Sequence, residues 1–381
     1  MSLTVEIIDN AEDMRPLEAE WNVIAAQFKT PLLRYEWFTA CVEAFCPPGK
    51  PKIIVVKDGT KVTGIAPLVL RPSFGIRRLQ ILGAAVLGEP TGFLYADELS
   101  LEYLAKAILS FRKPLLLSRL PTGSPELQSM DLSTKKRWRY SQRYVNETPW
   151  ISISTSWDKY YSSISSSWRS AFRRSQRKAE SLGKVEFEVV SPDTAHVQHH
   201  LDEVFRVEAA GWKQRVGTAL QTYQALRRFF EIYSQATARL GILRIALMRI
   251  NGKVVSVQLL VENSRRLWIL KIGYDEAYAH CSPGILLMNN VIQYAFEKRL
   301  EGFEFLGGNE AWIRIWPHDV HRLESYRLYP LSPMALLSHG LEVSASSLKK
   351  IHAVKEKHCK KHAWKALASK AMARFKPSGT L

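Results

Sequence analysis

Residues 1 to about 150 show a helical pattern of apolar positions that then changes to a strand pattern. Segments 14–28 and 36–45 place apolar side chains at helical spacing. Two runs rich in β-branched residues follow, 52–57 and 61–70, and Asp58-Gly59 joins them. Because Asp-Gly favours a tight hairpin turn, this half is predicted to contain paired helices followed by a β-hairpin.

The same order of patterns returns in the second half of the chain. Segments 197–215 and 221–240 are predicted to be helices, and strands are predicted over 243–250 and 254–261. Asn251-Gly252 joins these strands, and both positions of that turn favour positive φ. The repeated order predicts a duplicated α/β fold whose two copies have diverged in sequence.

A strand, a turn and a helix then follow in an order that suits an anion. A strand is predicted over 267–274, a turn at Ser282-Pro283-Gly284, a helix over 285–300 and a strand over 303–306 that leads to Gly307-Gly308. Pro suits a first helical turn, and Gly permits close approach of a ligand. A helix N-terminus beyond a strand end offers backbone N–H groups to a phosphate. Taken alone, Ser-Pro-Gly also begins many ordinary helices.

Length and charge divide the chain further. With 381 residues we expect two domains, 1–150 and 151–332, followed by a basic tail, 333–381. Nine of the 17 units of net positive charge lie between residues 349 and 381 of that tail, where there are ten Lys or Arg and one acid, Glu356. Such a tail can contact anionic lipid, nucleic acid or an acidic protein, or it can simply be solvated.

Composition limits the compartment and the chemistry. The apolar runs are too short to cross a bilayer, and the N-terminus lacks the basic and apolar regions of a signal peptide. We therefore expect a cytoplasmic protein. The four cysteines have neither metal-site nor disulfide spacing, so no metal is expected. Cys281 lies beside the predicted turn, where a catalytic thiol is less expected than chance placement.

Four ordered segments carry a resemblance to a known family. They are WRSAFRRSQRKAESLGKVEFEV, VEAAGWKQRVGTAL, KIGYDEAYAHCSPGILL and FEFLGGNE, within residues 157–330. Together they resemble the GNAT acyltransferases of the CelD/BcsL (cellulose or polysaccharide biosynthesis) type, which are related to the FemAB-like transferases. The segments EWNVIAA, YEWF and VTGIAPL of residues 20–70 resemble the N-terminal half of the same proteins.

The resemblance implies a tandem GNAT-like α/β fold with two mixed central sheets flanked by helices. The C-terminal half would hold acetyl-CoA or another acyl-CoA between two splayed strands, 267–274 and 303–308. A strand-edge N–H would polarise the thioester carbonyl. The implied cofactor-binding residues are Ile272, Gly273, Ser282, Pro283, Gly284 and Ile285.

A general base must deprotonate the acceptor, and three acids in the matching segments are candidates. Glu310 closely follows Gly307-Gly308, where its side chain would reach a cleft; the alternative is that it caps the next segment. Asp275 could instead be a turn or N-cap acid. Glu208 could instead be a solvated helix-face acid near Lys213.

Four further residues are candidates for acceptor binding: Trp212, Lys213, Lys271 and Trp312. Trp212 is more readily explained as a core residue, and Lys213 equally well as a surface lysine. Lys271 lies in an apolar strand, so it lines a cleft or points outward from an edge. Relatives often carry an aromatic-Lys pair after the Gly-Gly-x-Glu turn, whereas Ile313 follows Trp312 here, which leaves open reduced or altered activity.

The sequence therefore predicts an acyltransferase that moves an acyl group, acetyl in the first instance, to an amine or hydroxyl of a sugar, polysaccharide precursor or similar metabolite. One alternative is a FemAB-like transferase that takes its donor from charged tRNA. Another is a GNAT fold without activity that acts as a binding protein. The acceptor, acyl chain length and oligomeric state are not encoded in any pattern that we can interpret.

Overall fold

The computed structural model describes residues 3–46, 51–73, 75–134, 138–210 and 223–344. Twelve of its strands form one continuous sheet, and a short thirteenth, β5 (Leu94–Tyr95), pairs with β3. In spatial order the twelve are β1 (Leu3–Ile8), β2 (Pro51–Asp58), β3 (Lys61–Ser73), β4 (Ile76–Ile81), β6 (Leu115–Pro121), β13 (Asp319–Pro330), β7 (Trp138–Ser152), β12 (Gly302–Glu304), β11 (Arg266–Tyr274), β10 (Lys253–Asn263), β9 (Leu243–Ile250) and β8 (Val185–Val190).

The strand order reads the same way from both edges. β1-β2-β3-β4-β6 corresponds to β8-β9-β10-β11-β12, and each half contains one parallel pair, β4 with β6 and β11 with β12. The Asp58-Gly59 and Asn251-Gly252 hairpins occupy matching places, with the glycines at φ 60° and 76°. The duplication predicted from the sequence is confirmed by this topology.

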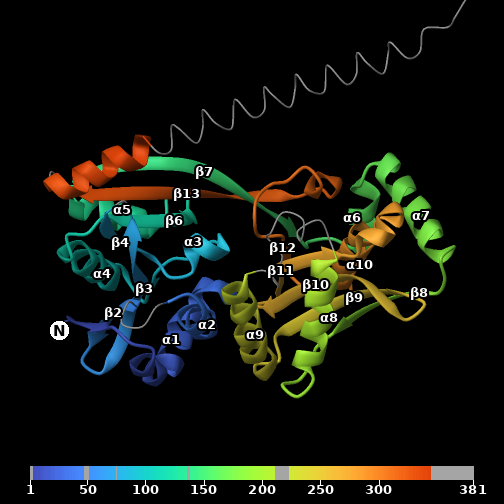
Figure 1. Ribbon diagram of the computed structural model, residues 1–381, viewed down its shortest axis with the longest axis horizontal. Coiled ribbons are helices and arrows are strands. Elements are labelled where there is room, and N and C mark those ends of the chain that lie inside the picture. The colour runs from blue at the N-terminus through green and yellow to red at the C-terminus, as the bar shows by residue number, and fades with distance from the viewer. Residues whose placement is uncertain (1–2, 47–50, 74, 135–137, 211–222, 345–381) are drawn as a thin grey trace, which may run out of the picture.

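The last strand of each half lies beside the other half. β7 pairs with β12, β13 pairs with β6, and β7 and β13 pair with each other along their length. Figure 1 shows these two strands running across the molecule. They join the two predicted sheets into one, and β7 spans the predicted domain boundary near residue 150. The division into 1–150 and 151–332 remains a prediction.

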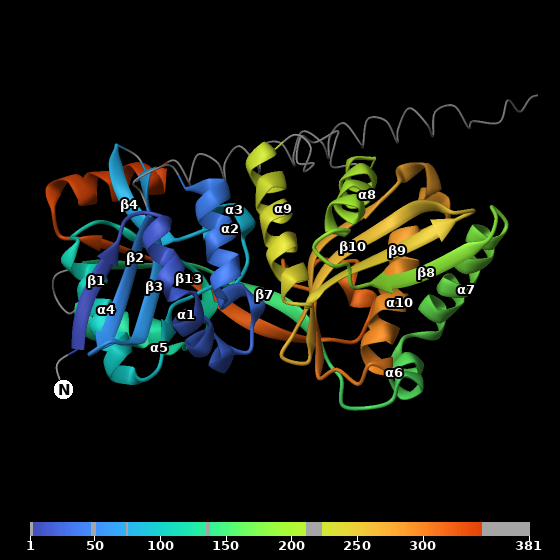
Figure 2. The same cartoon turned by 90° about the horizontal axis from the view of Figure 1, so that it is seen from below.

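Helices cover the sheet in corresponding positions. In the N-terminal half they are α1 (Glu18–Ala25), α2 (Tyr35–Phe45), α3 (Ala84–Leu87), α4 (Glu98–Ser110) and α5 (Pro125–Thr134). In the C-terminal half they are α6 (Trp157–Ser163), α7 (Ser166–Glu180), α8 (Val197–Ala209), α9 (Gln224–Arg239) and α10 (Pro283–Glu297). Figure 2 shows α2 and α9 side by side between the halves.

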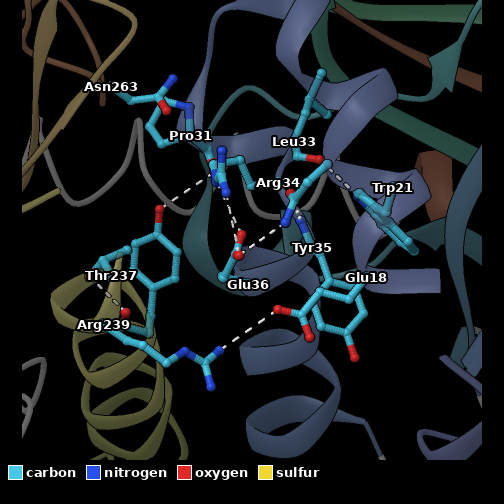
Figure 3. A network of polar contacts seen from close by, with 12 residues as sticks. Glu18, Trp21, Pro31, Leu33, Arg34, Tyr35, Glu36, Thr237, Arg239 and Asn263 are labelled. Atoms are coloured by element: carbon cyan, nitrogen blue, oxygen red, sulfur yellow. Dashed lines mark hydrogen bonds and ion pairs between the residues drawn. The ribbon is translucent and has the colours of Figure 1, made fainter. Parts of the chain in front are cut away.

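The contact between α2 and α9 gives the halves a shared core. The Trp37 ring lies 5.0 Å from Phe229 and 5.1 Å from Tyr233, edge to face. Around this apolar centre Arg239 forms an ion pair with Glu18, shown in Figure 3. Burying aromatic rings in this way removes large apolar areas from water, so the halves are expected to unfold together.

A further helix, residues 333–344, follows β13 and is called the terminal helix below. It packs on the N-terminal half (Figure 1). Among the described residues, no helix is long and apolar enough to cross a membrane.

Candidate functional site

β11 and β12 diverge after a short parallel pairing. They pair only through Arg266–Trp268 and Gly302–Glu304. On its other edge β11 shifts register against β10, so that Leu270 is an extra residue between Ile269 and Lys271. Because a β-bulge bends the strand that carries it, this insertion accounts for the departure of β11 from β12.

A cavity of about 160 Å³ lies where the strands diverge. One wall is formed by residues 269–272 of β11, and the other by residues 305–308 after β12. Glu310, Trp312 and Ile313 complete the lining on the C-terminal side. The structure thus brings the two predicted strands, the Gly-Gly turn and Glu310 around one space. It is the place at which a strand-edge N–H could face a thioester.

The helix after β11 begins at Pro283, two residues earlier than predicted from the sequence. Ser282 is therefore the N-cap residue, in the left-handed conformation at φ 52°, and Gly284 lies within the first turn instead of a separate turn. The Ser282 side chain accepts no capping hydrogen bond among the described residues, and the first turn contains only uncharged residues. The positive end of the helix dipole thus lacks a carboxylate from its own segment.

One basic side chain approaches this helix end. The Lys178 ammonium of α7 lies 3.5 Å from the carbonyl oxygen of His280, in the short η4 helix (Glu276–Cys281) just before Ser282. A cation at a helix N-terminus further favours a phosphate there. Lys178 thus brings one of the basic side chains of α7 to the predicted anion turn.

Two of the predicted cofactor-binding glycines fit tightly against protein. A Cβ at Gly273 would lie 2.9 Å from the Cα of Glu208, so this glycine lets α8 pack closely on β11. A Cβ at Gly284 would lie 3.3 Å from Cδ1 of Tyr274. The space left by both missing side chains is taken by the protein itself. A ligand could therefore contact these glycines only through their backbone, and the Gly273 carbonyl already accepts the Ser256 hydroxyl at 3.0 Å.

The three predicted bases lie in different surroundings. Glu310 is exposed on the cavity rim, and its Oε2 accepts the indole N–H of Trp312 at 2.7 Å. Asp275 is the N-cap of η4: its Oδ1 accepts from Ala277 N at 3.0 Å, and its Oδ2 lies 3.2 Å from the Lys253 ammonium. The alternative role of Asp275 as a capping acid is thus observed.

Glu208 is buried in α8, at 2% exposure, so the alternative of a solvated helix-face acid is wrong. The backbone of Glu208 packs against Gly273 of β11. Lys271 lines the cavity, and its ammonium lies 5.2 Å from the centre of the Phe230 ring of α9. Trp212 and Lys213 lie outside the described residues.

Ile313 and Cys281, two residues singled out in the sequence, are both buried. Ile313, where relatives often have Lys, is buried at 2% exposure and packs in the C-terminal core. An ammonium at this position would be desolvated, so an aliphatic side chain suits the site. Cys281 is buried as well, and burial raises the pKa of its thiol, which disfavours the reactive thiolate.

Sequence patterns did not identify two residues of the N-terminal half that hold the Gly307-Gly308 turn. Glu89 Oε2 accepts the N–H of Gly307 at 3.2 Å, and Arg119 donates to the carbonyl of the same residue. Burial raises the pKa of the Glu89 carboxyl, although the Gly307 N–H and the cations Arg119 and Lys271 act in the opposite direction. Glu89 also lines the cavity.

This double contact explains a strained stretch of backbone. Gly307 has φ 60°, and the preceding Leu306 has φ 56°, a conformation that a branched side chain rarely adopts. Both the N–H and the carbonyl of Gly307 are hydrogen-bonded to the N-terminal half. These contacts hold the turn that leads to Glu310, three residues on, beside the cavity. No local sequence pattern could have revealed these two contacts, since Glu89 and Arg119 lie 218 and 188 residues before Gly307.

Comparison with protein families identifies the class. Residues 166–314, from α7 to the segment after Glu310, match the family described as acetyltransferase (GNAT) domain. The match covers the diverging strands and the helix with the open N-terminus. No curated protein matches the chain.

Solved structures share the fold over nearly the whole chain. FemX matches with a TM-score of 0.57 and 13% identity, covering 88% of this chain and 99% of that one. The C-terminal domain of a putative lysylphosphatidylglycerol synthetase from Agrobacterium fabrum gives 0.53 and 12%, over 88% and 96%. A conserved protein of unknown function from Bacteroides thetaiotaomicron gives 0.53 and 11%, over 86% and 100%. At these identities the likeness concerns the fold alone.

The chain therefore contains a GNAT-superfamily acetyltransferase domain within a mixed α/β fold. It is an acyltransferase, and acyl-CoA is the co-substrate that such a domain generally implies. Within the described residues, no group of three or more His, Cys, Asp or Glu side chains could hold a metal ion.

Proposed function

We propose that this protein transfers an acyl group, acetyl in the first instance, from acyl-CoA to an amine or hydroxyl of a sugar, polysaccharide precursor or similar metabolite. The observation that carries the proposal is the cavity between β11 and β12; the helix that follows β11 along the chain begins without a carboxylate. The acceptor class comes from the resemblance to CelD/BcsL-type proteins and rests on that analogy.

In the proposed arrangement the first turn of α10 and Lys178 receive the pyrophosphate. The acyl end of the co-substrate then lies between the strands, where a backbone N–H of residues 272–273 would stabilise the developing oxyanion. Ser282, Pro283, Gly284 and Ile285 are the residues proposed for the phosphate end.

Glu310 is the proposed general base, since it lines the cavity whereas the Asp275 side chain is engaged in a cap and an ion pair. It would take the proton from the acceptor as the acceptor attacks the thioester carbonyl. The C–S bond then breaks, and CoA leaves as the thiolate. Trp312 holds one oxygen of Glu310 and so fixes the direction of the other.

A matched pair of variants at Ser282 tests the phosphate end. Asn and Asp have nearly the same shape and both tolerate the left-handed conformation, but Asp places a negative charge at the helix N-terminus. Acetyl-CoA is titrated calorimetrically into the wild type, Ser282→Asn and Ser282→Asp. We expect the Asn variant to bind like the wild type and the Asp variant about tenfold more weakly or worse, a difference of about 1.4 kcal/mol.

Equal affinities of the two variants for acetyl-CoA would contradict the proposal that the phosphate binds at this turn. If the wild type bound neither acetyl-CoA nor longer acyl-CoAs, the co-substrate assignment would be lost. The alternatives of charged tRNA as donor, or of a binding protein without activity, would then come first.

A further inference from the structure

The terminal helix has its polar side buried and its apolar side exposed. Ala335, Ser338 and Glu342 face the protein, at 3%, 3% and 6% exposure. The large apolar side chains of the helix are exposed, as is Leu331 two residues before it; those of the helix are Met334, Leu336, Leu337, Leu341 and Val343. This is the reverse of the usual arrangement, in which a surface helix buries its apolar stripe.

Ion pairs hold the helix in this orientation. Glu342 Oε1 lies 2.7 Å from Arg78 Nη1 of β4 and 2.6 Å from Arg327 Nη1 of β13, and Tyr329 donates to its other oxygen. The His339 ring meets the Tyr329 ring at 4.5 Å. A buried carboxylate with two arginine partners fixes the rotation of the helix about its axis, so Met334, Leu337 and Leu341, at helical spacing, are presented together on one exposed flank.

The three side chains on this flank are well exposed. Leu337 and Met334 are 60% and 61% exposed, and Leu341 follows Leu337 by one turn. Contiguous exposed apolar side chains of this kind mark an interaction surface. Figure 1 shows the helix on the outer side of the N-terminal half, well separated from α10, so the surface is distinct from the acyl-transfer site.

Charge indicates what covers this surface. The chain that follows the helix contains ten Lys or Arg against one Glu between residues 349 and 381, together with Trp364 and Phe375. Basic and aromatic residues next to an exposed apolar helix face are the combination that holds a protein at an anionic bilayer surface. A second copy of the chain would bring together two such basic segments and two net charges of +17, which repel each other.

We propose that Met334, Leu337 and Leu341 of the terminal helix bind the surface of a membrane that contains anionic lipid. The helix lies in the plane of the interface, with Met334, Leu337 and Leu341 toward the acyl chains. The net positive charge of the protein adds electrostatic attraction to the anionic lipid.

The full chain is tested by flotation with phosphatidylcholine vesicles that do or do not contain phosphatidylglycerol. The apolar contact is removed in Leu337→Asp/Leu341→Asp. Val23→Asp is the control, since Val23 is 73% exposed on α1 and the substitution likewise places an aspartate at an exposed apolar position, away from the terminal helix. Because the substituted side chains are exposed, the three proteins should have similar thermal unfolding midpoints.

We expect the wild type and Val23→Asp to float with the phosphatidylglycerol vesicles and to be released by salt. The double variant should bind about tenfold more weakly or worse, since it no longer buries two leucines. Three results would overturn the proposal: no flotation of the wild type, undiminished binding of the double variant, or equal binding to vesicles without anionic lipid. A wild-type dimer that the double variant converts to a monomer in light scattering would assign the surface to a second copy instead.

Discussion

The two halves share a strand order but differ at one helix N-terminus. In the N-terminal half α4 begins after Asp97, whose carboxylate accepts the N–H of Ser100 at 2.7 Å, and Glu98 is in its first turn. In the C-terminal half α10 begins after Ser282, without an acid in the first turn. Carboxylates at α4 occupy the place that a phosphate would take at α10.

The two parallel strand pairs, β4 with β6 and β11 with β12, also differ in what lies next to them. β4 and β6 pair through two residues each, and α3 contacts both strands. The corresponding segment between β11 and α10 is η4, and a cavity remains between β11 and β12. One copy of the duplicated unit thus has a filled crevice and a capped helix, and the other has an open one. The filled copy contributes Glu89 and Arg119 to the site of the open copy.

The largest effect is expected at the cavity rim. Glu310→Gln should lower kcat for acyl transfer about 100-fold or more, because an amide cannot accept the proton of the acceptor. The affinity for acetyl-CoA should stay unchanged, since Glu310 is proposed to act on the acceptor and residues 282–285 to bind the phosphate. Thiol release with an acceptor found by screening measures the rate.

Glu180→Gln, an exposed substitution on α7, serves as the control for that experiment. If Glu310→Gln retained full activity while Glu89→Gln lost it, the base would belong to the filled copy, and the division of labour between the halves would have to be reversed.

The smaller structural contrast can be measured at α4. Asp97→Ala should lower the free energy of unfolding by about 1 kcal/mol, because the N–H of Ser100 loses its capping oxygen. Asp97→Asn keeps an acceptor and should lose less. Denaturant unfolding gives both values. Acetyl-CoA affinity should be the same in both variants, and a loss of affinity in Asp97→Ala would show that α4 takes part in binding.

The smallest effect concerns Glu89 and depends on pH. Because burial raises the pKa of this carboxyl, its ionised form is the costly one in the folded protein. The wild type therefore loses this contribution to stability as pH rises through the folded pKa, and Glu89→Gln does not. The unfolding midpoint of Glu89→Gln should exceed that of the wild type at pH near 7 and match it below the unfolded value, about 4.3. A difference that grows toward low pH would contradict this assignment.

How much the sequence reveals depends on the range of the contacts. The two Asx-Gly hairpins and the strand before Ser282 are local patterns, and the structure confirms them. β7 and β13 were not predicted: polar residues interrupt the apolar positions in both sequences, and the position of each strand depends on pairing with the opposite half. The start of α10 was placed too late because Pro283 and Gly284 were assigned to a turn, whereas Pro is well suited to the first helical position.

The site shows the same limit. The cavity wall from β11 and the Gly-Gly turn could be anticipated from segments that match a family. The Leu270 bulge that separates the strands leaves no signal in a run of apolar residues. Glu89 and Arg119 belong to the N-terminal half, where no motif indicated site residues.

Hydrogen exchange of the full chain with and without acetyl-CoA tests the contrast between the halves most directly. We predict slower exchange on binding in peptides that cover residues 269–273, 282–286 and 305–310. Peptides that cover 79–83 and 97–101, the corresponding places in the N-terminal half, should be unchanged. Protection of the second set without the first would place the co-substrate in the wrong half and contradict the account.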